Sequence, residues 1–439
     1  MASGKLSATV VGLGYVGLPT AALLASRGFR VNGNDIDAAR IEAVNRGETH
    51  IAEPEVADLI RAMVAKGSLR AHADCKPAQM FIIATPTPIR EDKSSDISYV
   101  ESAARSLAPA LAPGNLVVIE STCPVGTTQA ISELLAGLRP DLSFPHQRPE
   151  KSDIHLAYCP ERVLPGNTLN ELRNNARIIG GLDRRSAWVA RNLYRRAVDG
   201  EISTTGAKVA ELSKLLENAY RDVNIAFANE VSLVAAHFGL DVREIIALAN
   251  KHPRVNILRP GAGVGGHCIP VDPWFVHEAA PELTPLIAAA RKVNDGKPAW
   301  VARQILGLAS QRGDKSVALL GLAYKADIGD LRESPAVDVA ELVAREFAGD
   351  ILIADPFIDE LPPALARFRN VRLAPTAEAL DGAGLVALLC AHSSFTNLAP
   401  DALAGKTIVD PAGILPADIA AVLDTAAGSF AAVSCARAS

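Results

Sequence analysis

Residues 6–17 read LSATVVGLGYVG, an apolar run followed at once by a glycine-rich turn. The apolar run is typical of a buried parallel strand, and the apolar residues beyond Gly17 predict a helix that packs against it. A second predicted strand, about Phe29 to Asn34, ends at Asp35. This order of strand, GxGxxG turn, helix, strand and acidic residue is typical of a dinucleotide-binding α/β unit.

Each part of this fingerprint has a physical role. Gly12 makes the turn, Gly14 lets the backbone approach a pyrophosphate, and Gly17 permits close helix packing. The helix N-terminus offers N–H groups and the positive end of the helix dipole to phosphate. A carboxylate at Asp35, or at Asp37 if the strand ends later, would bind the ribose hydroxyls and repel a 2′-phosphate. We therefore expect NAD rather than NADP as the cofactor.

Further buried strands are predicted at residues 80–84, 116–119 and 154–158. Cofactors of such sheets lie beyond the carboxyl ends of the strands, so Thr87 and Thr122, which follow the first two, are candidate cofactor contacts. Their hydroxyls would serve equally well as helix or turn caps. The third strand leads into the sequence CPERVLPG, which places an acidic and a basic side chain next to each other after a strand end.

A second glycine-rich segment, GAGVGGHCIPVDPWF at residues 261–275, contains the single cysteine Cys268. Its glycines allow close approach to another group, because glycine has no Cβ. Arg254 and Arg259 lie just upstream, and the arginine fork suits phosphate oxygens. Two interpretations are open. The segment is either an anion loop that delivers a substrate to a thiol, or a tight turn before a helix with a buried cysteine.

The middle of the chain predicts one long helix over residues 205–237, with apolar side chains at three- and four-residue spacing and no internal Pro or Gly. Lys214 and Asn218 lie four residues apart on one face of this helix. A helix this long and apolar is difficult to cover within one subunit. We therefore expect a homodimer built on it, since twofold dimers are the commonest oligomers.

The last third of the chain predicts a second α/β unit. Helices are expected from about residue 281 to 309, followed by strands near residues 317–320, 351–355, 385–389 and 407–410. The turn after the first of these strands lacks a full GxGxxG, so we expect a substrate role rather than a second dinucleotide site.

The predicted fold is therefore α/β, with two Rossmann-like doubly wound parallel-sheet domains joined by a long central helix. A chain of 439 residues exceeds one ordinary core. We expect an NAD-binding domain at 1–203, a central helical domain with the cysteine loop at 204–310, and a C-terminal Rossmann-like substrate-binding domain at 311–439.

Composition excludes several classes of function. The net charge is −5 with no basic block, so nucleic acid is not an expected partner. No apolar run approaches the ~18 residues that a membrane helix needs, and no membrane partner or signal peptide is expected. The six cysteines form no CxxC pair, which favours neither a metal site nor a disulfide framework and fits a reducing cytoplasm.

Six ordered motifs together resemble the nucleotide-sugar 6-dehydrogenases, the UDP-glucose and UDP-N-acetylhexosamine dehydrogenase group, over nearly the whole chain. The motifs are GLGYVG at 12–17, ESTCPVG at 120–126, CPERVLPG at 159–166, KLLEN at 214–218, GGHCIPVDPWF at 265–275 and YKADIGDLRESP at 324–335. The GGHC form followed by DPWF resembles the N-acetylhexosamine branch, and within it the UDP-N-acetyl-D-mannosamine dehydrogenases most. The UDP-glucose branch usually carries serine and lysine where this chain has His267 and Val271.

The resemblance implies a four-electron oxidation of the sugar C6 from alcohol to acid, with two NAD reduced, to make a precursor of surface polysaccharide. Cys268 would trap the aldehyde as a thiohemiacetal, which is then oxidised to a thioester and hydrolysed. Lys214 and Asn218 would stabilise the developing oxyanion, with Lys214 also a candidate acid or base. Asp272 would handle a proton or orient a water, and Glu161 would be the base for hydrolysis.

The resemblance also implies that the C-terminal domain at 311–439 is a UDP-sugar-binding domain, and it implies the binding residues. Implied cofactor contacts are Gly12, Gly14, Tyr15, Val16, Gly17, Asp35, Arg40, Thr87, Thr122 and Arg332. Implied UDP-sugar contacts are Arg162, Val163, Lys214, Asn218, Arg221, His252, Arg254, Arg259, Gly263, Tyr324 and Lys325. In the expected homodimer, Arg254 would reach the neighbouring subunit.

Two kinds of alternative remain open, other substrates within this group and other classes of protein. Within the group, the substrate would be UDP-N-acetyl-D-glucosamine or UDP-glucose. From other classes, a two-electron hydroxyacid dehydrogenase would share the Rossmann domain, the long helix and a Lys/Asn pair, but it needs no cysteine. An inactive NAD-binding regulator would not need the intact set of Lys214, Asn218, Cys268 and Asp272.

Overall fold

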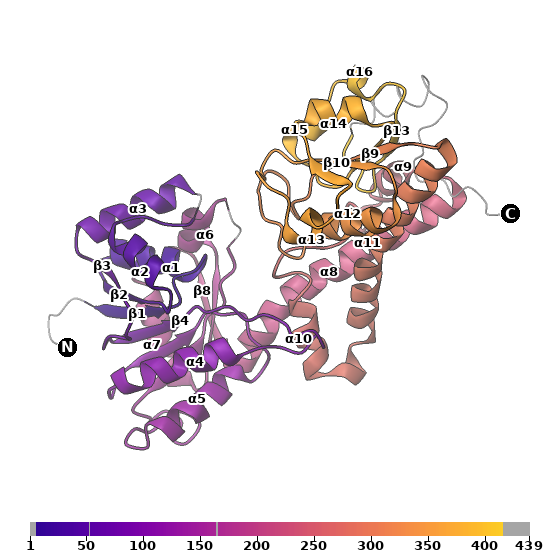
Figure 1. Ribbon diagram of the computed structural model, residues 1–439. Helices are drawn as coiled ribbons and strands as arrows, with labels where there is room; N and C mark the ends of the chain where they lie inside the picture. Colours follow the sequence, from indigo (N-terminus) through magenta and orange to yellow (C-terminus); the bar gives the residue numbers. More distant parts are fainter. Residues whose placement is uncertain (1–5, 52, 164–165, 416–439) are drawn as a thin grey trace. The chain divides into compact units, whose positions relative to one another are not determined.

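The computed structural model describes residues 6–51, 53–163 and 166–415 (Figure 1). The expected ends of the outer domains, at residues 1 and 439, lie outside the described residues, as do Leu164 and Pro165 of the CPERVLPG motif. The chain forms two compact units. The first comprises residues 1–217 with 274–281, and the second comprises residues 218–273 with 282–439.

The first unit is built on an eight-stranded sheet in the order β3-β2-β1-β4-β5-β6-β7-β8. Its first six strands are parallel and follow the 3-2-1-4-5-6 order of a dinucleotide-binding fold. The pair β6–β7 is antiparallel, and β7 and β8 are parallel to each other. The strands are β1 (Ser7–Val11), β2 (Arg30–Asn34), β3 (Leu69–His72), β4 (Met80–Ile83), β5 (Leu116–Ile119), β6 (His155–Tyr158), β7 (Arg177–Gly181) and β8 (Ile202–Gly206).

Apolar side chains on both faces of this sheet explain why its central strands β4 and β5 are continuously hydrophobic. In β4, Met80 and Ile82 belong to one buried cluster, whereas Phe81 and Ile83 belong to the cluster on the opposite face. Helices contribute side chains to both clusters. They are α1 (Gly17–Ser26), α2 (Ala38–Asn45), α3 (Pro54–Ala65), α4 (Ser98–Leu107), η1 (Ala108–Ala110), α5 (Thr127–Leu138), α6 (Thr168–Asn174) and α7 (Arg184–Tyr194).

The second unit contains a five-stranded, fully parallel sheet in the order β11-β10-β9-β12-β13. This is a second doubly wound order, so the prediction of two Rossmann-like sheets is confirmed. The strands are β9 (Ser316–Leu320), β10 (Asp350–Ala354), β11 (Val371–Leu373), β12 (Leu385–Leu388) and β13 (Thr407–Val409). The helices around them are α9 (Val242–Ala249), α11 (Pro285–Arg312), α12 (Pro335–Glu346), α13 (Pro363–Ala366), α14 (Thr376–Gly382), α15 (Ser393–Thr396) and α16 (Pro400–Leu403). Two short elements, α10 (Asp272–Ala279) and η2 (Pro281–Leu283), precede α11.

The predicted long helix is α8, which spans 32 residues, Ala207–Phe238. It begins two residues later than expected, because Thr205 is a β-branched residue paired with β7 in strand β8. At about 1.5 Å per residue the helix is roughly 48 Å long. In the second unit α8 and α11 run alongside each other (Figure 1), joined by an ion pair of 2.5 Å between Asp222 and Arg291.

The polarity of α8 is the reverse of that of an ordinary surface helix. Six polar side chains are buried between small and aliphatic ones on its inner side. They are Glu211, Lys214, Asn218, Asp222, Asn229 and Ser232. Large apolar side chains at the same three-, four- and seven-residue spacing are exposed instead. They are Val209, Leu212, Leu216, Tyr220, Phe227, Val234 and Phe238.

Among residues 6–51, 53–163 and 166–415, no helix combines the length and the apolar character that crossing a bilayer requires.

Candidate active site

The turn between β1 and α1 is shaped by two of its three glycines. Gly12 has a φ of +93°, and a Cβ there would lie 2.6 Å from the carbonyl oxygen of Ala84. A Cβ on Gly17 would lie 1.9 Å from the carbonyl oxygen of Gly12. At Gly14, by contrast, no atom lies within 4 Å of the Cβ position. The turn therefore leaves open space beside the N-terminus of α1, which fits the pyrophosphate of a dinucleotide.

Asp35 lies directly after β2 and faces this turn. Its carboxylate accepts hydrogen bonds from the Leu13 N–H at 2.8 Å and the Asp37 N–H at 3.0 Å, and it pairs with Arg40 at 3.1 Å. Burial raises the pKa of Asp35, but these donors together lower it by more, so the carboxylate is ionised at neutral pH. Asp37, the alternative candidate, is instead the N-cap of α2.

The other expected cofactor residues lie at the turn, beyond strand ends and in the second unit. The Tyr15 ring is exposed and meets His50 edge-on at 5.1 Å. Val16 is the N-cap of α1 and makes no side-chain capping bond. Thr87 and Thr122 are partly exposed beyond β4 and β5. Arg332 belongs to the second unit and pairs with Asp330 at 2.6 Å.

The segment after β6 meets α8 within the first unit. Burial raises the pKa of Glu161 to about 7, and the positive charge of Lys214 opposes a further rise. The Glu161 carboxylate accepts a hydrogen bond from the Val163 N–H, which fixes its orientation. Arg162 makes a two-point ion pair with Glu217 of α8, at 2.6 and 3.1 Å. Glu161 thus has the proton affinity of a general base near neutral pH.

A buried polar cluster lies under this segment and was not foreseen. Glu120 accepts hydrogen bonds from the Tyr194 hydroxyl at 2.6 Å and from the Thr20 hydroxyl at 3.2 Å, and Arg177 lies 4.0 Å away. Arg177 also contacts the sulfur of Cys159, two residues before Glu161. The only signal in the sequence was the charged residue directly after the apolar run 116–119, where β5 ends.

In the second unit, Cys268 is a partly buried cysteine at the start of a helical turn. The Asp272 N–H donates to the carbonyl of Cys268 at 2.9 Å, and α10 begins at Asp272. The Asn218 side-chain amide donates to the Asp272 carboxylate at 2.6 Å, and both side chains are buried. Cys268 and Asp272 thus lie one helical turn apart, and Asn218 of α8 holds the carboxylate.

The glycines before Cys268 permit a close approach to the protein's own chain. Gly263 has a φ of +153°, and a Cβ there would lie 2.7 Å from Pro335. A Cβ on Gly265 or Gly266 would lie 2.7 or 2.8 Å from Tyr324. The Gly266 N–H also donates to the carbonyl of Arg332 at 3.2 Å. These glycines are therefore required because the cysteine loop packs on residues 324–335.

Two asparagines hold the chain that leads into the cysteine loop. The Asn229 side chain, fully buried in α8, accepts from the Gly261 N–H at 2.9 Å and donates to Asn294 of α11 at 2.9 Å. Asn250 makes two hydrogen bonds to the backbone of Ile257, at 2.7 and 3.0 Å. The helical spacing of Asn218, Asp222 and Asn229 on one side of α8 could have identified this polar row in the sequence.

The remaining expected substrate residues lie at the surface of the second unit. Arg221, His252, Arg254 and Arg259 are exposed, and Lys325 is partly buried. The backbone N–H of Arg254 donates to the His252 ring at 3.4 Å, so these two belong to one turn.

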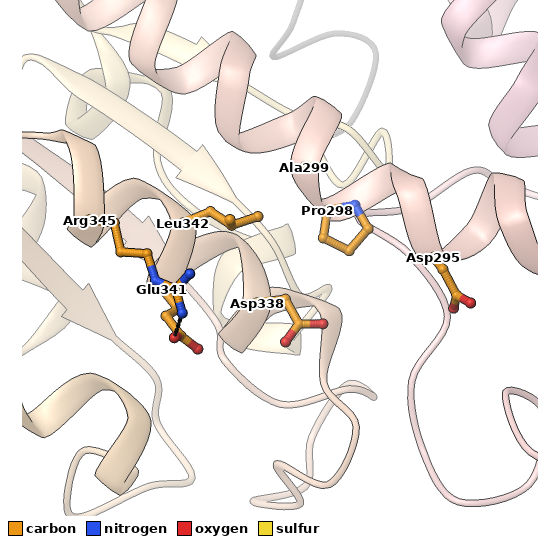
Figure 2. Close-up of a pocket in the computed structure, with 7 residues that line it drawn as sticks. All are labelled: Asp295, Pro298, Ala299, Asp338, Glu341, Leu342 and Arg345. Atoms are coloured by element: carbon orange, nitrogen blue, oxygen red, sulfur yellow. Dashed lines mark hydrogen bonds and ion pairs between the residues drawn. The ribbon is translucent and has the colours of Figure 1, made fainter. Parts of the chain in front are cut away.

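A hollow of about 270 Å³ lies between α11 and α12 (Figure 2). Three carboxylates line it, those of Asp295, Asp338 and Glu341, and Arg345 pairs with Glu341 there. Partial burial and the neighbouring carboxylates raise the pKa of Asp338. This acidic lining would repel a diphosphate and includes no expected substrate residue, so the hollow does not fit a nucleotide sugar.

Within the described part of the chain, no group of three or more His, Cys, Asp or Glu side chains is arranged to hold a metal ion.

Three family models match the chain in succession. Residues 6–198 match the NAD binding domain of the UDP-glucose/GDP-mannose dehydrogenase family, residues 208–296 its central domain and residues 318–417 its UDP binding domain. The expected cofactor, NAD, is confirmed by the first of these matches.

Known proteins resemble the chain over nearly its whole length. It is 49% identical over 406 residues to the NDP-N-acetyl-D-galactosaminuronic acid dehydrogenase of Ralstonia nicotianae, covering 92% of this chain and 95% of that protein. It is 47% identical over 414 residues to the UDP-N-acetyl-D-mannosamine dehydrogenase of Escherichia coli strain K12, covering 92% and 98%. A solved UDP-D-ManNAc dehydrogenase from Pyrococcus horikoshii superposes with a TM-score of 0.84 at 37% identity, covering 94% and 96%. The chain therefore belongs to the UDP-glucose/GDP-mannose dehydrogenase family of NAD-dependent nucleotide-sugar oxidoreductases, as its motifs predict.

Proposed function

We propose that this protein oxidises UDP-N-acetyl-D-mannosamine at C6 to UDP-N-acetyl-D-mannosaminuronic acid. The observation that carries the proposal is the position of the Cys268 thiol, one helical turn from Asp272, whose carboxylate Asn218 holds at 2.6 Å. A two-electron alcohol dehydrogenase needs no thiol. A four-electron oxidation does, because a thioester divides the second oxidation and the hydrolysis into two accessible steps.

The choice of sugar rests on residues beside the nucleophile and on the relatives. His267 and Val271 stand where the UDP-glucose branch usually has serine and lysine, which favours an N-acetylhexosamine. Relatives at 47% identity are named UDP-N-acetyl-D-mannosamine dehydrogenase. A second candidate is the corresponding N-acetylgalactosamine derivative, because a relative at 49% identity is named NDP-N-acetyl-D-galactosaminuronic acid dehydrogenase. Either product would be an acidic sugar precursor of surface polysaccharide.

The reaction converts the C6 alcohol, two NAD⁺ and water into the carboxylate, two NADH and three protons. NAD, when bound, supplies the acceptor for both hydrides. The Cys268 sulfur adds to the C6 aldehyde and forms the C–S bond of a thiohemiacetal. Loss of the second hydride leaves a thioester, and water breaks the C–S bond to release the acid and the thiol.

The polar side chains of α8 would act on the charge that develops at C6. Lys214 and Asn218 would donate to the oxyanion, and Lys214 would also accept or return the hydroxyl proton. Asn218 keeps Asp272 oriented, so that its carboxylate can hold a proton or a water beside the sulfur. Glu161 would take the proton of the hydrolytic water, in keeping with its pKa of about 7.

Binding roles follow the same proposal. Asp35 would take the adenosine ribose of NAD, beside the open space at Gly14. Tyr324 and Lys325 would hold the nucleotide sugar with Arg254 and Arg259. Cys75, Cys159 and Cys390 are free thiols, which supports a reducing cytoplasm as the location.

The test of this proposal is NADH formation with UDP-N-acetyl-D-mannosamine, UDP-N-acetyl-D-galactosamine, UDP-N-acetyl-D-glucosamine and UDP-glucose. We expect the highest kcat/KM with the first sugar and two NADH for each sugar consumed. Cys268→Ser should abolish acid formation without weakening binding of NAD or UDP, because the thiol forms the acyl intermediate. Cys75→Ser is the matched control, since burial raises the pKa of that thiol to about 12. A yield of one NADH, or steady acid formation by Cys268→Ser, would refute the four-electron mechanism.

The pKa of Glu161 predicts a pH dependence. A general base acts when deprotonated, so kcat should be constant above about pH 7 and fall below it, by about tenfold per pH unit for a single essential proton. Glu161→Gln should lower kcat and remove this limb from the profile. Glu133→Gln, a change to an exposed carboxylate on α5, is the control and should leave the profile unchanged. An unaltered acidic limb in Glu161→Gln would assign it to another group.

Asp35 and Asp37 can be separated by matched substitutions. Asp35→Asn should raise the Kd for NAD about tenfold, the effect of losing a charged hydrogen-bond partner. Asp37→Asn should change it less than twofold, because asparagine still caps α2. Isothermal titration with NAD measures both. A larger effect at Asp37 would move the ribose contact to that residue.

We further propose a homodimer in which the exposed apolar side chains of α8 are covered by a second copy. The support is the row of large side chains, among them Tyr220 and Phe227, which are 71% and 56% exposed. Sedimentation velocity should show a dimer for the wild type and a folded monomer for Phe227→Asp. Trp188→Asp changes an equally exposed residue on α7 and should remain dimeric. A wild-type monomer with full activity would contradict the proposal.

A further inference from the structure

We propose that His392 is a positioning residue, which fixes the nucleotide-sugar loop, residues 322–330, in the shape that binds UDP. The inference rests on the proposed function in one respect only, the assignment of Tyr324 and Lys325 to the nucleotide sugar. It concerns a histidine outside all six sequence motifs, far along the chain from the loop it holds.

The second unit repeats the backbone of the NAD turn. The Gly321 N–H donates to the carbonyl of Ala354 at 2.8 Å, just as the Gly12 N–H donates to Asn34 at 2.8 Å. Gly321 has a φ of +88° and Gly12 one of +93°. Both turns therefore leave the first strand of their sheet with the same geometry.

The acidic residue after the second strand is repeated as well. Asp355 accepts from the Leu322 N–H at 2.7 Å and from the Phe357 N–H at 2.9 Å. The corresponding bonds of Asp35, from Leu13 and Asp37, measure 2.8 and 3.0 Å. Asp355 thus occupies the position that holds a ribose in a dinucleotide-binding unit.

The two acids differ in what covers them. Asp35 pairs with Arg40, whose side chain is 35% exposed, whereas Asp355 pairs with the fully buried His392 at 3.1 Å. The His392 ring is itself stacked on Phe357 and meets Phe395 edge-on. A ribose could displace the arginine, but it could not reach Asp355 through this packed ring. The second acid therefore serves the loop instead of a ligand.

The hydrogen bonds of His392 define its protonation. The Asp327 N–H donates to Nδ1 at 2.9 Å, so Nδ1 carries a lone pair, and Nε2–H donates to Asp355. The neutral ring thus links Asp327 to the same carboxylate that holds the Leu322 and Ala323 N–H groups. Both ends of the segment 322–327 are therefore hydrogen-bonded to the buried pair of Asp355 and His392.

Asp327, at the C-terminal end of that segment, needs these hydrogen bonds to keep its conformation. Asp327 has a φ of +60°, a left-handed conformation that is unfavourable for a residue other than glycine. Besides the His392 ring, the Ser393 N–H and hydroxyl hold its carboxylate at 2.9 and 2.6 Å. Release of this residue would relax the loop and move Tyr324, whose ring packs against Gly266 of the cysteine loop.

The test compares substitutions that keep one bond of His392 each. The amide of His392→Asn can replace Nδ1 as the acceptor for Asp327, and that of His392→Gln can replace Nε2 as the donor to Asp355. We expect His392→Ala to raise the Kd for UDP about tenfold, the effect of an unsatisfied buried group. His392→Asn should recover most of the affinity and His392→Gln less, because only the former holds Asp327. The Kd for NAD should stay within about twofold of the wild type in all three.

The control is Leu403→Ala, which removes a buried side chain from the same core without touching the loop. It should lower Tm while leaving the Kd for UDP unchanged, which separates positioning from general destabilisation. Unchanged UDP binding in folded His392→Ala, or an equal loss in Leu403→Ala, would overturn the inference. Because UDP alone is the probe, the outcome does not depend on the sugar. A wild type that binds UDP but oxidises no nucleotide sugar would refute only the proposed function, whereas a wild type that binds no UDP would overturn the inference.

Discussion

Burial of polar side chains along α8 is the constraint on which the candidate residues of both units depend. A polar group removed from water without a hydrogen-bond partner costs on the order of 1–3 kcal/mol, and an unpaired charge costs more. Each buried polar side chain of α8 therefore needs a hydrogen-bond or ion-pair partner from another segment. The Glu211 carboxylate accepts hydrogen bonds from the Gly126 and Thr128 N–H groups at the N-terminus of α5, at 2.7 and 2.8 Å. The Asp222 carboxylate forms an ion pair with Arg291 and accepts a hydrogen bond from Asn294, both on α11.

The same requirement for partners positions the segments that hold the proposed catalytic residues. Lys214 lies near Glu161 in the first unit, and Asn218, one turn further along, holds Asp272 in the second. The Asn229 side chain accepts a hydrogen bond from the N–H of Gly261, the first residue of the cysteine loop. In the proposed mechanism, side chains held in this way would need little ordering when substrate binds, and preorganisation of this kind is a large term in catalysis. The large apolar residues of α8 are exposed on its other side, and this connects the helix to the proposed dimer.

Sequence reasoning recovered the parts whose signals are local. The GxGxxG turn and the pattern of buried strands predicted both sheets. The glycines of the cysteine loop predicted a close approach correctly, but the group approached is Tyr324 and Pro335 of the same chain. Contacts between distant segments left no local pattern. The Asn229–Gly261 bond joins a helix to a loop 32 residues later, and Glu120 meets Tyr194 across 74 residues. Such pairs depend on how the strands are ordered, which single side chains do not reveal.

The two sheets also show how one backbone design acquires two uses. A glycine in a left-handed turn and an acidic residue after the next strand bring the same N–H groups to the same carboxylate in both units. That arrangement stabilises the turn whether or not a nucleotide binds, because the carboxylate accepts backbone N–H groups that would otherwise lack a partner. What decides the use is the remaining face of the carboxylate. With a partly exposed arginine there, as at Asp35, the face can be opened to a ribose. With a buried aromatic ring there, as at Asp355, the same carboxylate can only organise the chain around it.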